Sequence, residues 1–128
     1  MRGASALGAL LAKHPAARVR VLVVWEPVLD SDLGPPVDAV RAPLRDPRVA
    51  EYWDPDHWMS QRAMELARRL ALAAGAPPPT PDQIAWDFVA LYSAGARWAD
   101  PFPAPSWHGE PVVRSLGRVE EILKAASQ

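Results

Sequence analysis

The chain has 128 residues, of which 49% are hydrophobic and 23% charged, and its formal net charge is -1 at pH 7. These values are ordinary for a globular protein, so we expect residues 1–128 to form one folded domain. The balanced charge argues against nucleic acid or a membrane surface as a partner, and the absence of cysteine excludes disulfides, zinc–thiolate sites and thiol nucleophiles within this polypeptide.

The N-terminal segment has the spacing of a short amphipathic helix. Ser5 is placed to cap its start and Pro15 to end it. Its apolar face consists of Leu7, Leu10, Leu11 and His14. The apolar stretch is shorter than a membrane span and lacks a small-residue cleavage site, so we expect a cytoplasmic protein without a membrane partner.

The clearest strand is Arg18 to Val28, RVRVLVVWEPV. Its continuous apolar, β-branched part is typical of a central strand that is covered on both faces. Because Pro27 cannot donate a hydrogen bond to a neighbouring strand, we expect regular pairing to end near Glu26.

Two helices are predicted in the middle of the chain. Asp46 and Pro47 favour a helix that carries Val49, Tyr52 and Trp53 and ends before Pro55. The segment Trp58 to Ala74 has a clear apolar stripe, and Gly75 is its expected C-terminal cap.

The C-terminal third predicts a hairpin and a closing helix. IAWDFVALY, residues 84–92, favours a strand, Gly95 permits a tight reversal, and Arg97 to Ala99 is expected to return as an edge strand. SLGRVEEILKAASQ, which begins at Ser115, has an amphipathic helical pattern.

The order of strand, crossover helix, hairpin and closing helix resembles the C-terminal part of a thioredoxin fold. WDFVALYSAGARWAD is similar to the hairpin of that fold, and SLGRVEEILKAASQ is similar to the helix behind it. RVRVLVVWEPVL and DPRVAEYWDPDHW also resemble bacterial thioredoxin-like proteins in which a Cys-x-x-Cys motif precedes an Arg-Gly-Ala-like helix start, and this chain begins Met1-Arg2-Gly3-Ala4.

The resemblance implies an α/β, thioredoxin-like three-layer sandwich over residues 1–128 that lacks its N-terminal strand and redox motif. The chain is then the C-terminal portion of a thiol or selenol oxidoreductase, redox-inactive as given because it has no cysteine. Either cysteine or selenocysteine codons lie upstream of Met1, or the protein has lost redox function. The alternative function is a non-catalytic thioredoxin-like module for interaction or dimerisation.

The resemblance also implies a cis-proline just before the first hairpin strand, and Pro81 is the candidate. No catalytic residue, cofactor or resident metal is predicted.

Among residues that carry ionisable groups, Asp54, Asp56 and His57 form the densest polar cluster. With His108 as a further ligand they suggest a metal-assisted hydrolase, but turn formation at Asp54 and helix capping at Asp56 explain them more simply. Glu26, at the end of the central strand, is either a buried base or a solvent-exposed carboxylate.

Two further expectations concern pairing. We expect Asp87 to pair with Arg97 across the hairpin. A sheet without its first strand leaves an uncovered edge, so we expect a homo-oligomer or a protein partner at that edge, with some of the six tryptophans as anchors.

Overall fold

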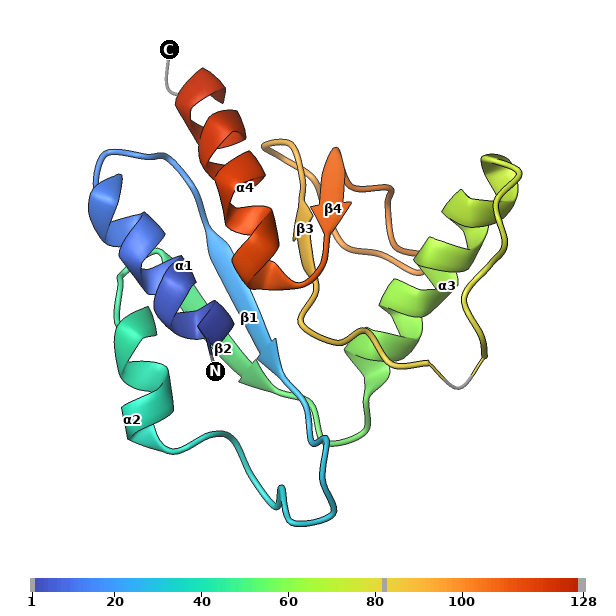
Figure 1. Ribbon diagram of the computed structural model, residues 1–128, viewed down its shortest axis with the longest axis horizontal. Helices are drawn as coiled ribbons and strands as arrows, with labels where there is room; N and C mark the ends of the chain where they lie inside the picture. The colour runs from blue at the N-terminus through green and yellow to red at the C-terminus, as the bar shows by residue number, and fades with distance from the viewer. Residues whose placement is uncertain (1, 82, 127–128) are drawn as a thin grey trace.

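The computed structural model describes residues 2–81 and 83–126 and has a mixed α/β fold (Figure 1). No helix in the described ranges is long and apolar enough to cross a membrane. In chain order the elements are α1 (Arg2–Lys13), β1 (Val21–Trp25), α2 (Asp38–Arg41), the 3-10 helix η1 (Ala42–Leu44), β2 (Val49–Trp53), α3 (Trp58–Ala73), β3 (Val89–Leu91), β4 (Trp107–Gly109) and α4 (Val112–Ala126).

The helix predicted after Asp46 is wrong, because Val49–Trp53 is the strand β2. It lies parallel to β1, with Val21 opposite Val49 and Trp25 opposite Trp53. Its β-branched and aromatic residues suit a pleated surface, and pairing with β1 outweighs the local helix-start signal. The Asp46 carboxylate instead accepts a hydrogen bond from the Arg48 backbone N–H at 2.9 Å.

Strand β1 is shorter than predicted and has one strand neighbour, so the expectation of a central strand is wrong for the described residues. Leu22 is 39% exposed, which also contradicts cover on both faces. The predicted end of pairing is confirmed: the Asp54 N–H donates to the Trp25 carbonyl at 2.9 Å, and the strand stops before Glu26.

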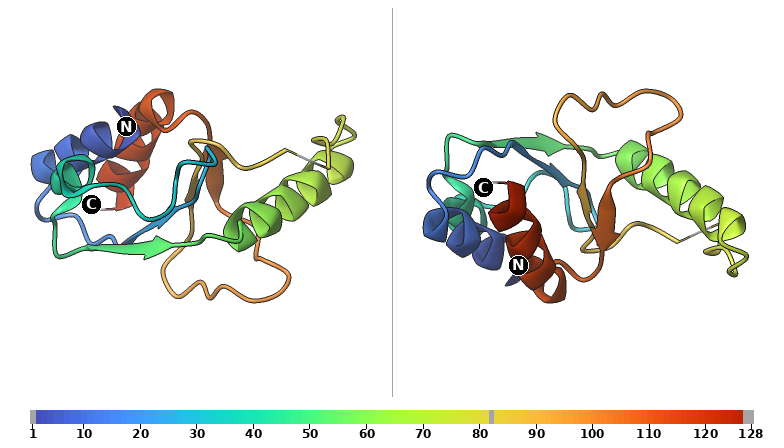
Figure 2. Two further views of the ribbon diagram at one scale, coloured as in Figure 1. Left: turned by 90° about the horizontal axis from the view of Figure 1, so that it is seen from below. Right: turned by 90° about the horizontal axis from the view of Figure 1, so that it is seen from above.

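Helices α1 and α4 lie side by side (Figures 1 and 2) and form the main core with the hairpin β3–β4. Both amphipathic helices are confirmed, although α1 begins at Arg2, so Ser5 lies inside it and does not cap it. The core centres on Leu10, Leu116 and Val119. Against it pack Ala6, Leu7, Val89, Leu91, Trp107, Val112 and Leu123.

Arg48 joins the end of α1 to β2. Its guanidinium donates to the carbonyls of His14 at 2.7 Å and Leu11 at 2.8 Å, and also to the Asp46 carboxylate at 2.7 Å. The side-chain hydrogen bond from Arg48 is the main reason that the pKa of Asp46 falls to about 2. Arg48 therefore adds a second hydrogen bond to two carbonyls at the end of α1, which also accept the backbone N–H groups of His14 and Ala17.

The predicted hairpin has the right turn and the wrong return strand. Gly95 adopts a φ of 83° and the Ala96 N–H donates to the Ser93 carbonyl at 3.1 Å, as a reversal requires. The first strand, however, is only Val89–Leu91, and its partner is Trp107–Gly109 instead of residues 97–99. The loop between β3 and β4 instead packs against α3: Phe102, only 5% exposed, lies between Trp98 and Trp58.

Helix α3 is confirmed, with Gly75 at a φ of 69° just after its end. It points away from the layer of α1 and α4 (Figure 2). The described strands form two separate sheets, β1–β2 and β3–β4, and therefore do not make a single sheet. Helix α4 lies between α1 and the hairpin in Figure 1.

Glu120 should make the α1–α4 packing sensitive to acid. Lys13, followed by His14 and Lys124, holds the pKa of Glu120 at about 2, against an ordinary value of 4.5. Because the folded-state pKa is lowered, the stabilisation is complete above about pH 4.5 and is lost as the pH falls through about 2. We expect Glu120→Gln to lower the melting temperature at pH 6 and to match the native chain near pH 2.

Thermal unfolding at pH 6, 4 and 2 checks this expectation. The matched control is Glu121→Gln, because Glu121 is 67% exposed and, among the described residues, pairs with Arg118 of its own helix. A melting-temperature difference for Glu120→Gln that stays constant down to pH 2 would contradict the assignment.

Candidate functional site

Glu26 connects the end of β1 to the start of α3. One carboxylate oxygen accepts the Ser60 backbone N–H at 2.8 Å, and the other accepts the Ser60 hydroxyl and lies 3.3 Å from His57 Nδ1. The Glu26 side chain is 13% exposed, and Ser60 is buried. Of the two alternatives for Glu26, the solvent-exposed one is therefore wrong, because donors of α3 draw the carboxylate inward.

Of the other predicted polar residues, Asp54 binds the same helix start and Asp56 does not. The Asp54 carboxylate accepts the Met59 N–H at 2.7 Å. The N-cap position belongs to His57, which has a φ of 57° and makes no side-chain capping bond. Predicted capping by Asp56 is therefore wrong: the free N–H groups are satisfied by carboxylates from further away, and Asp56 is exposed.

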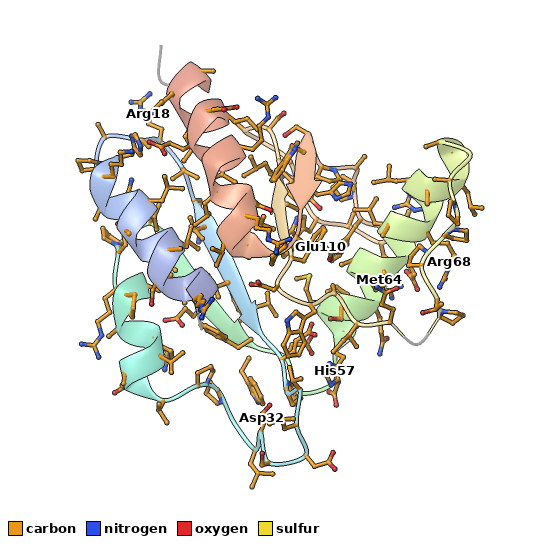
Figure 3. The ribbon with its side chains drawn as sticks, in the orientation of Figure 1. Arg18, Asp32, His57, Met64, Arg68 and Glu110 are labelled. Atoms are coloured by element: carbon orange, nitrogen blue, oxygen red, sulfur yellow. The ribbon has the colours of Figure 1, made fainter. Side chains whose placement is uncertain are left out.

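The cluster of Glu26, Asp54, His57 and Ser60 joins β1, the β2–α3 turn and α3, and Figure 3 labels His57 within it. Its order is serine, carboxylate, histidine, so Ser60 donates to Glu26 and not to His57. An activated serine needs its hydroxyl hydrogen-bonded to the base, with the carboxylate on the far side of the imidazole. The carboxylates in this cluster therefore cap the start of α3, and the arrangement does not activate Ser60 as a nucleophile.

The metal-site hypothesis finds no geometric support. Among the described residues, no three His, Cys, Asp or Glu side chains are placed to hold a metal ion. His108 lies on β4, where its ring packs against Phe88 at 5.7 Å, and not with Asp54, Asp56 and His57.

The candidate cis-proline is not Pro81. Within the described ranges the cis peptide bonds are Asp100–Pro101 and Glu110–Pro111. Pro81 lies in an exposed turn after α3, eight positions before β3 begins at Val89, so it does not adjoin a strand.

The predicted ion pair between Asp87 and Arg97 is also absent from the described contacts. Asp87 has a φ of 49°, and its carbonyl accepts the Val112 N–H at 2.9 Å, which ties the start of β3 to α4. Arg97 lies in the long loop and not on the return strand, so the two residues are not cross-strand partners.

Two groups with clear structural roles were missed by sequence reasoning. Glu51 on β2 accepts a hydrogen bond from Trp25 Nε1 at 2.8 Å and an ion pair from Arg41 at 3.1 Å. Phe102 stacks on Trp98, with ring centroids 5.3 Å apart. Neither residue has a local sequence signal: residues 49–53, VAEYW, do not alternate between apolar and polar, and Phe102 lies in a proline-rich loop.

The second candidate site is the free edge of β1, meaning the backbone groups of Leu22 and Val24. The Val21 N–H donates to the Arg48 carbonyl and the Trp25 carbonyl accepts the Asp54 N–H, so these residues direct their backbone toward β2. In a parallel ladder the residues between them direct their backbone the other way. No other described strand pairs with that edge.

The surface area is large for this chain length. The chain exposes 8703 Å², whereas a compact folded protein of 14.0 kDa exposes about 6,700 Å². Several large apolar side chains contribute, among them Leu29 at 65%, Leu33 at 92% and Trp86 at 57%. The surplus of about 2,000 Å² is comparable to the area that an ordinary stable interface removes from water.

Comparison of the chain with protein-family models, with curated proteins and with solved structures gives no match.

Proposed function

We propose that this chain is the C-terminal portion of a thioredoxin-like thiol or selenol oxidoreductase and has no redox activity of its own, since it contains no cysteine. The observation that carries the proposal is the packing of α4 behind the hairpin. Leu116 and Val119 of α4 belong, with Leu10 of α1, to the core cluster against which Val89 and Leu91 of β3 and Trp107 of β4 pack. In the thioredoxin fold, which the sequence resembles, the closing helix packs behind the hairpin in the same way.

The free edge of β1 supports the same proposal. A further strand paired there would extend the β1–β2 sheet and cover part of the surplus surface. In the proposed enzyme that strand precedes the cysteine or selenocysteine motif.

Insulin reduction with dithiothreitol tests this function. We expect the pure chain to give no turnover above buffer. A longer protein that begins at in-frame upstream codons, with any in-frame UGA replaced by a cysteine codon, should reduce insulin. Turnover by the pure chain, or upstream DNA without in-frame Cys or UGA codons, would overturn the proposal.

A second candidate function is a non-catalytic module that binds a protein or a second copy through the same edge. The unpaired backbone groups of Leu22 and Val24 favour it, because an exposed strand edge readily pairs with another strand. A stable oligomer of the pure chain would favour this function.

A further inference from the structure

We infer that this chain binds one extended peptide segment, which pairs with β1 on one side and with β3 on the other. The inference rests on the second proposed function, the interaction module, and names its partner. The bound segment joins the two sheets into one, in the order β2, β1, peptide, β3, β4.

Both strands have unpaired backbone groups along one edge. In β1 these groups belong to Leu22 and Val24, which direct them away from β2. In β3 the Leu91 carbonyl accepts the Ser106 N–H at 2.8 Å, so Leu91 directs its backbone toward β4 and Ala90 directs its own the other way. No described strand pairs with either edge. Each edge can therefore accept one more strand.

The two free edges face each other. In Figure 1, β1 and β3 are the adjacent strands of the two sheets, and β2 and β4 lie on the outer sides. β1 and β3 do not contact each other as paired strands do, so they are farther apart than the spacing of about 5 Å between neighbouring strands. A partner that is itself a sheet offers one free edge and satisfies only one of the two strands. A single extended peptide has two edges and satisfies both.

Helix α1 holds the two edges in this arrangement. It leads into β1, and its first turn contacts the base of the hairpin. A Cβ placed at Gly3 would be 3.0 Å from the Asp87 carboxylate and 3.2 Å from Val112 Cβ. Asp87 precedes β3, and Val112 begins α4 directly after β4. The start of α1 therefore lies where β1 ends and β3 begins (Figure 1).

Charge favours one direction for the peptide. Exposed Arg20 directly precedes β1, and exposed Asp87 precedes β3. Because β3 runs opposite to β1 in Figure 1, these two residues mark opposite ends of the paired region. A peptide parallel to β1 places its first residue near Arg20 and its last near Asp87, so an acidic start and a basic end complement both charges. Between them, apolar residues suit Leu22, which is 39% exposed.

A tethered peptide tests the inference on the full chain. The probe Asp-Val-Thr-Val-Thr-Val-Lys is fused through a short Gly-Ser linker to the N-terminus, because the start of α1 adjoins both strands and a tether gives a high effective concentration. We expect amide exchange at Leu22, Val24 and Ala90 to slow by about tenfold or more. The melting temperature should rise by about 3 °C or more.

Two matched fusions separate strand pairing from the presence of a tail. Proline in place of both threonines removes backbone donors and should leave exchange and melting temperature as in the native chain. Exchange of the probe's Asp and Lys should give a smaller gain. Slower exchange on β1 or β3 alone would overturn the inference and leave a module that binds at one edge. No slowing at any of the three amides, or equal slowing by the proline fusion, would also overturn it. The insulin assay remains the separate test of the oxidoreductase proposal.

Discussion

Gly8→Ala should destabilise the chain by about 2 to 3 kcal/mol, although alanine is normally the better helix residue. Gly8 lies in α1 where the helix meets η1. A Cβ placed there would be 2.1 Å from the Pro43 carbonyl oxygen and 2.9 Å from its carbon. Both are backbone atoms, so relief requires α1 and η1 to move apart. Urea unfolding followed by circular dichroism measures the loss.

The matched control for this prediction is Gly117→Ala in α4. A Cβ at Gly117 meets nothing within 4 Å. We expect a gain of about 0.5 to 1 kcal/mol there, because alanine loses less backbone entropy than glycine in a helix. If Gly8→Ala raised stability, as Gly117→Ala should, the close contact between α1 and η1 would be refuted.

Phe102→Ala should cost about 3 kcal/mol, as expected for the truncation of a buried phenylalanine. The ring is 5% exposed and lies between Trp98 at 5.3 Å and Trp58 at 5.8 Å. The Phe102 carbonyl accepts a hydrogen bond from Arg69 at 2.7 Å. Since these contacts hold the loop on α3, we expect faster amide exchange in residues 93–106 and in α3.

Leu33→Ala is the control for apolar truncation without burial, because Leu33 is 92% exposed. Its stability should stay within about 0.5 kcal/mol of the native chain. Equal losses for Phe102→Ala and Leu33→Ala would show that the loop does not pack on α3 in solution.

The parts of the fold that local periodicity specifies were predictable. The apolar stripes of α1, α3 and α4 were sufficient to predict those helices, and Pro27 marked the end of β1. Residues 49–53 were predicted to be helical because Asp46 and Pro47 are good helix starters locally. The strand that pairs with residues 49–53, β1, lies more than 20 positions earlier in the sequence. Strand β4 is three residues long and follows a proline-rich loop, so no alternation could indicate it.

The candidate site was predictable only as a set of residues. Glu26, Asp54 and His57 stood out as polar residues near the ends of predicted elements, and the structure does bring them together. Their common target was not predictable, because Ser60 lies 34 positions after Glu26 and nothing local connects them. The carboxylates meet the free N–H groups of α3, which explains their position by helix capping.

The Arg48 clamp has a consequence for folding during synthesis. The Leu11 carbonyl at the end of α1 accepts one hydrogen bond from the His14 N–H and a second, at 2.8 Å, from a guanidinium 37 residues further along the chain. Until that residue has emerged from the ribosome, the last turn of α1 has only its local backbone hydrogen bonds. The end of the first helix is therefore reinforced only when the start of the second strand has been synthesised.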